Sequence, residues 1–209
     1  MTTGSDLLDL SPVIPVVVIE DVADAAPLAE ALLAGGIRVI EVTLRTPAAL
    51  DAIAAIHASV PDIVLGAGTV TSPEQAEQAV SAGSSFLVTP GTTPDVLDAC
   101  FATGLPFLPG AGTVSEAMRL AERGLTALKF FPAEAAGGVD YLKSVAGPLP
   151  GLRFCPTGGI SLATAPRYLA LPNVGCVGGS WLTPKNAVAA KDFGRIEALA
   201  KEASTLTRD

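Results

Sequence analysis

A lysine interrupts one of the most apolar segments of the chain. Lys129 lies between Leu128 and Phe130 in the segment TALKFFPAE, residues 126–134. Lysine is rarely buried without a reason. Burial favours the neutral amine, which attacks carbonyl groups and forms Schiff bases. The alternative is a lysine that bends outward along the edge of a sheet. If the side chain points inward, we expect Lys129 to be the nucleophile of a carbonyl reaction.

Schiff-base chemistry also needs a group that moves protons, and the segment VIEVTLRTP, residues 39–47, contains one. In a strand, the period of two places Glu41, Thr43 and Arg45 on the same face. Glu41 is therefore the candidate general acid/base, although its closeness to Lys129 depends on the fold. The alternative is a structural ion pair between Glu41 and Arg45.

Two pairs of glycines indicate a phosphate site. They occur in PTGGI, residues 156–160, and in VGGSW, residues 177–181. Paired glycines let backbone N–H groups approach an anion, and a serine hydroxyl adds a donor. One pair alone is more typical of a tight turn. Together they predict phosphate binding by Gly158, Gly159, Gly179 and Ser180.

Other residues at the ends of predicted strands complete the candidate site. Arg45 and Thr69 are suited to a substrate carboxylate, because a guanidinium binds carboxylates through two parallel hydrogen bonds. Phe131 alternates with Lys129 and is placed to shield an imine from water. The remaining candidates are Pro90 and Thr157.

Several charged residues receive no role at this point. Glu20 and Glu134 are interpreted as charges at the rim of the fold. The single histidine, His57, has no second histidine to pair with, so no histidine-built metal site is expected. The other lysines are expected to be solvated: Lys143, Lys185, Lys191 and Lys201.

The elements that position these residues are short β-branched runs that alternate with longer alanine-rich helical runs. Strands are predicted at 13–19, 39–44, 63–65, 86–88, 107–108, 127–131, 153–155 and 175–177. Helix starts are predicted after Thr46, Ser72, Thr93 and Ser161. A repeat of about 26 residues predicts an α/β protein with one (β/α)8 TIM barrel domain over residues 1–209. The alternative is a doubly wound sheet, but no dinucleotide fingerprint follows the first strand.

Composition limits the function further. The chain has 209 residues, of which 49% are hydrophobic, so it can bury a sizeable core. A net charge of −8 argues against binding to nucleic acid, and an anionic substrate would need a locally positive pocket. No apolar run approaches the roughly 20 residues of a membrane helix. The first basic residue is Arg38, so the start of the chain lacks the basic region of a signal peptide. Three cysteines without a CxxC pair are typical of buried thiols, and we expect a cytoplasmic protein.

Seven motifs follow one another along nearly the whole chain: PVIPVVVIED, GGIRVIEVTLRTP, GAGTV, LVTPG, LKFFPAE, FCPTGGI and CVGGSWL. In this order they closely resemble the class I aldolases of the Entner–Doudoroff family, the KDPG/KHG aldolases. The resemblance implies reversible cleavage of 2-dehydro-3-deoxy-6-phosphogluconate to pyruvate and D-glyceraldehyde 3-phosphate. It also implies 4-hydroxy-2-oxoglutarate as a second substrate of the family, a homotrimer, and no cofactor, nucleic acid or membrane partner.

Matched motif by motif, the resemblance implies that Lys129 is the Schiff-base lysine and Glu41 the general acid/base. It assigns Arg45 and Thr69 to the pyruvate carboxylate, and the two glycine pairs with their serine to the phosphate. Thr157 resembles the family's stereochemical determinant and favours the gluconate substrate. One departure is LPGAGTVSEA, residues 108–117, where relatives commonly have a proline near the serine that opens the helix. This departure leaves the chemistry unchanged.

Three alternatives stay open. A related 2-dehydro-3-deoxy-6-phosphogalactonate aldolase would use the same chemistry on the other epimer. A phosphosugar isomerase or synthase on the same barrel would need no covalent lysine. A noncatalytic phosphoester-binding protein would hold Glu41 and Lys129 as a buried ion pair and form no covalent adduct.

Overall fold

The computed structural model describes residues 3–207, and strands alternate with helices along this range. The strands are β1 (Val13–Val17), β2 (Val39–Thr43), β3 (Val64–Gly68), β4 (Phe86–Val88), β5 (Phe107–Leu108), β6 (Gly110–Ala111), β7 (Ala127–Phe130), β8 (Arg153–Pro156) and β9 (Val177–Gly179). The helices are α1 (Gly4–Asp9), the 3-10 helix η1 (Val22–Asp24), α2 (Ala25–Ala34), α3 (Ala49–Ser59), α4 (Pro73–Ser81), α5 (Pro94–Ala102), α6 (Val114–Glu122), α7 (Gly138–Ala146), α8 (Ala165–Leu169), α9 (Lys185–Ala189) and α10 (Phe193–Ser204). The predicted α/β fold is confirmed.

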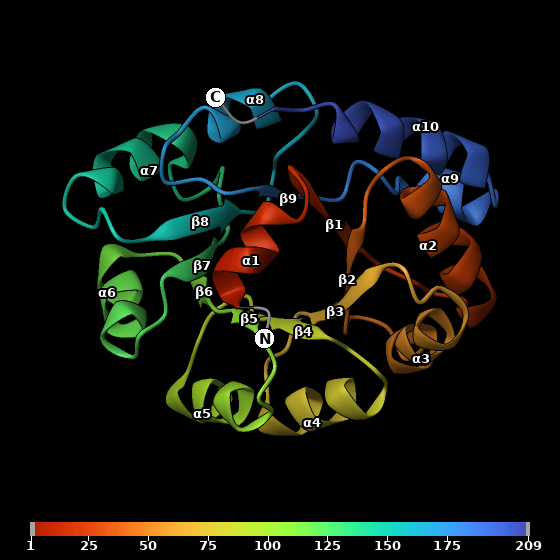
Figure 1. Cartoon of the computed structure of the whole chain (residues 1–209), viewed down its shortest axis with the longest axis horizontal. Coiled ribbons are helices and arrows are strands. Elements are labelled where there is room, and N and C mark those ends of the chain that lie inside the picture. Colours follow the sequence, from red (N-terminus) through yellow and green to blue (C-terminus); the bar gives the residue numbers. More distant parts are fainter. Residues whose placement is uncertain (1–2, 208–209) are drawn as a thin grey trace.

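The strands pair in parallel and form two sheets (Figure 1). Six strands follow the order β5, β4, β3, β2, β1, β9, and three follow the order β6, β7, β8. Val16 on β1 stands opposite Glu41, and Lys129 on β7 stands opposite Cys155. The two catalytic candidates therefore come from different sheets. Because the carboxyl ends of parallel strands lie on the same side, residues that follow the strands meet at one end of the fold.

A proline follows the fifth predicted strand, 107–108, and separates it from a short strand that was not predicted. Pro109 separates β5 from β6 and has no N–H group to donate to a sheet. Its carbonyl still accepts a hydrogen bond from the Lys129 N–H at 2.9 Å, while the Gly110 N–H donates to the Thr89 hydroxyl at 2.9 Å. On the far side of the three-stranded sheet, isolated bridges pair Phe154 with Val174 and Thr157 with Gly178. The predicted strand number is therefore wrong in residues 3–207, and a TIM-barrel-like arrangement replaces the predicted uninterrupted ring of eight.

Two of the predicted helix starts are confirmed and two are wrong. Ser72 and Thr93 cap α4 and α5, where each hydroxyl accepts a hydrogen bond from a backbone N–H three residues later. The hydroxyl of Thr46 donates to a carbonyl after β1, and that of Ser161 lies in a turn. Because these hydroxyls bond elsewhere, α3 and α8 begin later than predicted.

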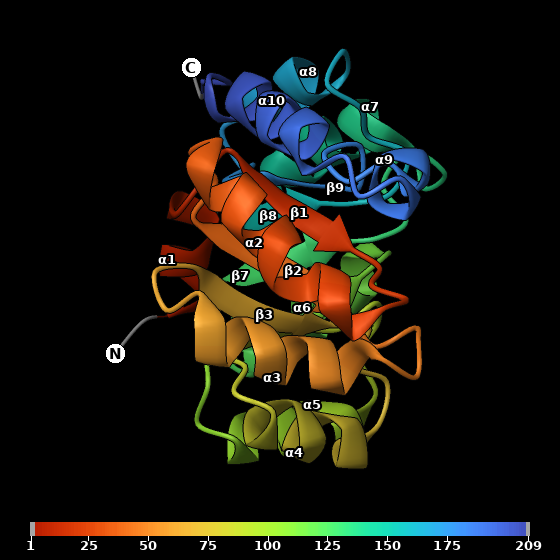
Figure 2. The ribbon, with the colours of Figure 1, turned by 90° about the vertical axis from the view of Figure 1, so that its right-hand side faces the viewer.

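Helix α1, which the sequence did not predict, covers the amino ends of the strands (Figures 1 and 2). Leu8 in this helix is fully buried, and Asp9 accepts two hydrogen bonds from Arg153 at 2.8 and 3.0 Å. A Cβ at Gly175 would lie 2.6 Å from the Leu8 Cβ, so α1 packs closely on the backbone before β9. The last strand starts later than the predicted run 175–177. Because α1 covers the amino ends of the strands, we expect the functional side chains at the carboxyl ends.

The remaining helices form an outer layer around the sheets (Figure 2). The side chains between the layers are largely Ala, Val, Leu and Ile, as the apolar runs predicted. All three cysteines are buried, as predicted for thiols of this kind. Within residues 3–207, no helix is long and apolar enough to cross a membrane.

Candidate active site

Two opposite charges meet inside the fold. Lys129 and Glu41 are each only 3% exposed, and Lys129 Nζ donates to Glu41 Oε1 at 3.1 Å. The Phe131 ring centre lies 5.7 Å from this ammonium group. The desolvation of a buried ion pair often exceeds its Coulomb attraction, so such a pair indicates chemistry more than stability. The inward orientation of Lys129 is as predicted, and the alternative of a Glu41–Arg45 ion pair is wrong.

A glycine makes room for this pair. Gly68, at the end of β3, lies against the Glu41 side chain. A Cβ at Gly68 would overlap Cγ, Cδ and Oε1 of Glu41. The glycine therefore lets the carboxylate cross the neighbouring strand and reach Lys129. This gives the first copy of the GAGTV repeat, residues 66–70, a direct connection to the catalytic candidates.

Arg45 and Thr69 are in contact, as their predicted shared role requires. The Arg45 Nε–H group donates to Thr69 Oγ1 at 3.1 Å, which leaves the terminal nitrogens of the guanidinium available. Thr69 has a φ of 60°, in the left-handed region that threonine rarely adopts. Such backbone strain costs about 1–3 kcal/mol and is concentrated at functional sites. The strained backbone directs the Thr69 hydroxyl at Arg45.

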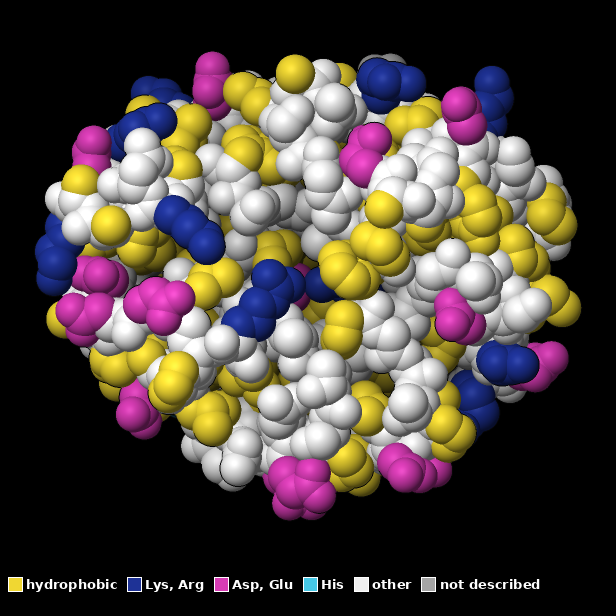
Figure 3. All heavy atoms as spheres, turned by 180° about the vertical axis from the view of Figure 1, so that it is seen from behind, with side chains coloured by type: hydrophobic (Ala, Val, Ile, Leu, Met, Phe, Trp, Pro, Cys, Tyr) yellow, Lys and Arg dark blue, Asp and Glu magenta, His cyan; other side chains and the backbone are white. Residues whose placement is uncertain are grey.

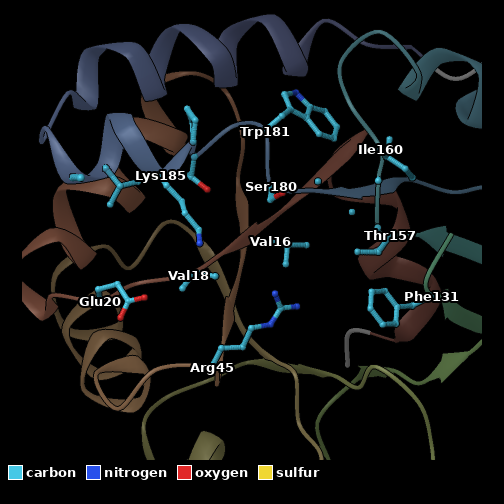
Figure 4. Close-up of a pocket in the computed structure, with 18 of the residues that line it drawn as sticks. Val16, Val18, Glu20, Arg45, Phe131, Thr157, Ile160, Ser180, Trp181 and Lys185 are labelled. Atoms are coloured by element: carbon cyan, nitrogen blue, oxygen red, sulfur yellow. The ribbon is translucent and has the colours of Figure 1, made fainter. Parts of the chain in front are cut away.

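A cavity of about 680 Å³ opens at the carboxyl ends of β1, β7, β8 and β9 (Figure 4). Figure 3 shows this end of the molecule, with basic side chains near its centre beside a hollow. The volume is typical of small-molecule sites. Seven predicted site residues line it: Arg45, Phe131, Thr157, Gly158, Gly159, Gly179 and Ser180. The Lys129–Glu41 pair lies beneath, because Phe131, two residues after Lys129, and Val16, opposite Glu41, both line the cavity.

The two glycine pairs differ in their backbone. Gly158 and Gly159 have φ values of 106° and 80°, which favour glycine and turn the loop after β8 across the cavity. A Cβ at Gly159 would lie 2.8 Å from the Glu134 side chain. At Gly179 the Cβ position is instead occupied by the Trp181 ring. A side chain at position 179 would therefore clash with Trp181, so packing requires glycine there in addition to any role at the cavity.

Thr157 holds a hydroxyl at the cavity wall. The residue is 6% exposed and follows β8, and its Oγ1 lies 3.4 Å from the Cys155 carbonyl oxygen. A Cβ at Gly178 would overlap this hydroxyl, so the bare backbone of β9 lets the threonine approach. The side chain is thereby fixed between two strands, as a residue that contacts one substrate hydroxyl needs to be.

Not every predicted residue lines the cavity. Thr69 reaches it only through Arg45. Pro90 packs its backbone against Gly110 and does not line the cavity, so the geometry does not support its predicted contact with substrate. Several residues without a predicted role also line it, among them Glu20, Trp181 and Lys185. The signal for Lys185 was its place shortly after the last strand, at the start of α9.

A second polar contact holds the loop after β7. Tyr168 on α8 is fully buried, and its hydroxyl donates to Glu134 Oε1 at 2.6 Å. Burial and this carboxylate raise the pKa of Tyr168 well above its usual value. The Glu134 N–H donates to the Gly158 carbonyl at 3.1 Å. Glu134, unassigned from the sequence, thus ties α8 to the predicted phosphate loop.

Comparison with known proteins places this site in a family. The family model described as KDPG and KHG aldolase matches residues 5–199. The 2-dehydro-3-deoxy-phosphogluconate aldolase of Pseudoalteromonas atlantica is 54% identical over 96% of this chain and 94% of its own length.

Solved structures agree with this match. The KDPG aldolase of Legionella pneumophila, with pyruvate captured as a covalent carbinolamine, is 46% identical with a TM-score of 0.95, over 98% of this chain and 99% of that one. The 2-keto-3-deoxy-6-phosphogluconate aldolase of Zymomonas mobilis, with 3-phosphoglycerate, is 48% identical with a TM-score of 0.93, over 98% and 96% of the two chains. With its buried lysine and carboxylate beneath a cavity, the chain belongs to the family of KDPG and KHG aldolases.

Proposed function

We propose that this chain is a class I aldolase that reversibly cleaves 2-dehydro-3-deoxy-6-phosphogluconate to pyruvate and D-glyceraldehyde 3-phosphate. The observation that carries the proposal is the 3.1 Å contact between Lys129 and Glu41 directly beneath a cavity that Arg45 enters. A nucleophilic amine and an acid/base within hydrogen-bond distance are what imine formation requires.

Lys129 acts as the nucleophile. Transfer of one proton from its ammonium group to Glu41 gives the neutral amine, which adds to the C2 carbonyl of the keto acid. Glu41 passes protons from the nitrogen to the departing oxygen, and loss of water leaves a protonated imine. The C4 hydroxyl gives its proton to the Glu41 carboxylate, the C3–C4 bond breaks, and its electrons move into the imine. The aldehyde leaves, the enamine takes up a proton at C3, and water releases pyruvate and the free amine.

The cavity residues orient the substrate around this pair. Arg45, held by Thr69, binds the carboxylate next to the reacting carbonyl. Phe131 shields the imine, and Thr157 contacts the hydroxyl on the carbon that is attacked in the reverse reaction. The phosphate binds where neutral donors gather: Gly158, Gly159, Gly179 and Ser180.

The hydroxyl of Thr157 favours the gluconate epimer over the galactonate epimer, since a donor fixed at the cavity wall rewards one orientation of the substrate hydroxyl. The family description also includes KHG, and 4-hydroxy-2-oxoglutarate, which yields pyruvate and glyoxylate, is the second candidate substrate. We further infer that the two sheets act as one (β/α)8 barrel in a single domain. The homotrimer and the cytoplasmic location stay predictions from the resemblance and from the composition.

The decisive experiment is borohydride reduction in the presence of pyruvate, followed by digestion and mass mapping. We expect the reduced adduct on Lys129, and none in Lys129→Ala or without pyruvate. Lys143→Ala, on the outer helix α7, is the matched control and retains the adduct. A folded wild-type protein that binds phosphoesters but forms no adduct would contradict the aldolase mechanism and favour the isomerase or the binding protein.

A further inference from the structure

Lys185 places an ammonium group in the cavity that the predicted phosphate loops also line. The residue begins α9 and lines the cavity, and Figure 4 shows its side chain extending toward Val18. Across residues 3–207, the ion pairs use other lysines: Lys129 pairs with Glu41, and Lys191 with Asp24 at 3.2 Å. Lys185 forms no ion pair in that part of the chain. Its charge is therefore available to a ligand.

The other charged side chains that line the cavity either have a partner or role already or would repel an anion. Arg45 bonds to Thr69 and serves the carboxylate end. Asp24 lines the cavity but is held by Lys191. Glu20 lies on the same side of the cavity as Lys185 and belongs to no ion pair in the described residues (Figure 4). A second anionic group of a ligand would meet this carboxylate unless a cation offsets it.

We propose that the Lys185 ammonium binds the phosphate monoester at the far end of the substrate and sets the preference for phosphorylated over unphosphorylated substrates. This inference rests on the proposed function. The glycine loops supply neutral donors, whereas hydrogen bonds from a charged donor to phosphate are shorter and stronger. In a chain with a net charge of −8, a local cation is what lets a dianion enter. Lys185 is thus a specificity-determining residue, and Glu20 acts against it.

The test compares Lys185→Met, Lys185→Arg and the control Lys201→Met, which lies on the outer helix α10. For the phosphorylated keto acid, we expect Lys185→Met to raise KM about tenfold with kcat retained, because uniform binding is lost. Lys185→Arg keeps the charge and a near-normal KM, and Lys201→Met changes nothing. With 2-keto-3-deoxygluconate, which lacks the phosphate, Lys185→Met leaves KM unchanged. Glu20→Gln lowers KM for the phosphorylated substrate, because a repelling carboxylate is removed. Added salt reduces the difference in KM between wild type and Lys185→Met, because it screens the charge of Lys185.

Pyruvate trapping in the same variants separates this inference from the proposed function. If Lys129 is trapped in both proteins but Lys185→Met keeps a normal KM for the phosphorylated substrate, the role of Lys185 is refuted and the aldolase stands. If Lys185→Met raises KM equally for both substrates, the side chain shapes the cavity and the phosphate contact is wrong. If wild type traps no pyruvate, both ideas fail.

Discussion

Replacing Gly68 by alanine tests whether the position of the Glu41 carboxylate, and not merely its presence, sustains catalysis. The new methyl group would overlap three atoms of the Glu41 side chain, so the carboxylate must move off Lys129. Gly68 lies in β3 and not in the left-handed region, so alanine suits its backbone and gains about 0.5–1 kcal/mol there.

The expected magnitude follows from these contacts. Removing one partner of a buried ion pair costs about 3–5 kcal/mol. In Gly68→Ala both partners remain and only separate, so the loss in unfolding free energy should be smaller, about 1–3 kcal/mol. General acid/base catalysis contributes about 10²- to 10⁴-fold. We therefore expect kcat to fall by about 10²-fold or more while the protein stays folded.

Three measurements check this expectation: pyruvate release in a coupled assay, the rate of borohydride trapping, and urea unfolding. Gly147→Ala is the matched control, because Gly147 has φ −66° and nothing lies within 4 Å of its added Cβ. A Gly68→Ala protein with near-wild-type kcat and trapping rate would refute the assignment of Glu41 as the proton carrier at this position.

Three further predictions concern single side chains. Glu41→Gln should bind pyruvate but turn over about 10²- to 10⁴-fold more slowly, and normal turnover in steady-state assays would contradict its role. Tyr168→Phe should lose about 1.5 kcal/mol of unfolding free energy at neutral pH, because the hydrogen bond to Glu134 is lost. Since the folded-state pKa of Tyr168 is raised, the stability it contributes is present below its ordinary pKa of about 10 and falls as the pH rises above it. The difference in unfolding free energy between wild type and Tyr168→Phe, measured with urea, should therefore decrease between neutral and strongly alkaline pH. A difference that stays constant would contradict the raised pKa of Tyr168. Burial raises the pKa of Cys100 to about 11, so iodoacetamide at mildly alkaline pH should label it only after unfolding in urea, as mass mapping would show.

The central pair was predictable because each residue breaks a local rule. A lysine in an apolar strand has few explanations. Glu41 lies on the same strand face as Arg45, the residue predicted to bind the substrate carboxylate. The 3.1 Å contact between them joins residues far apart in the chain, so no spacing could have shown it. Only the parallel arrangement of strands, inferred from the alternating pattern, brought them together.

Features that depend on contacts between distant segments were missed. Helix α1 is short and its burial against Gly175 leaves no periodic signal. The Tyr168–Glu134 contact joins α8 to the loop after β7, and nothing in either segment indicates the other. The division at Pro109 did carry a signal, since proline lacks the N–H group that a continuous strand requires.

The coverage of one end of the fold by α1 has a kinetic consequence. Within residues 3–207, buried leucines and the Asp9–Arg153 pair close the amino ends of the strands, so we expect ligands to reach Lys129 through the cavity at the other end. The pyruvate half, bound to Lys129 below the cavity, then lies farther from the cavity opening than the aldehyde half. We expect an ordered reaction in which the aldehyde departs first and pyruvate last, and in the reverse direction pyruvate must enter before its partner. A dead-end complex should form when an aldehyde occupies the mouth of an empty site, so high aldehyde concentrations should inhibit synthesis.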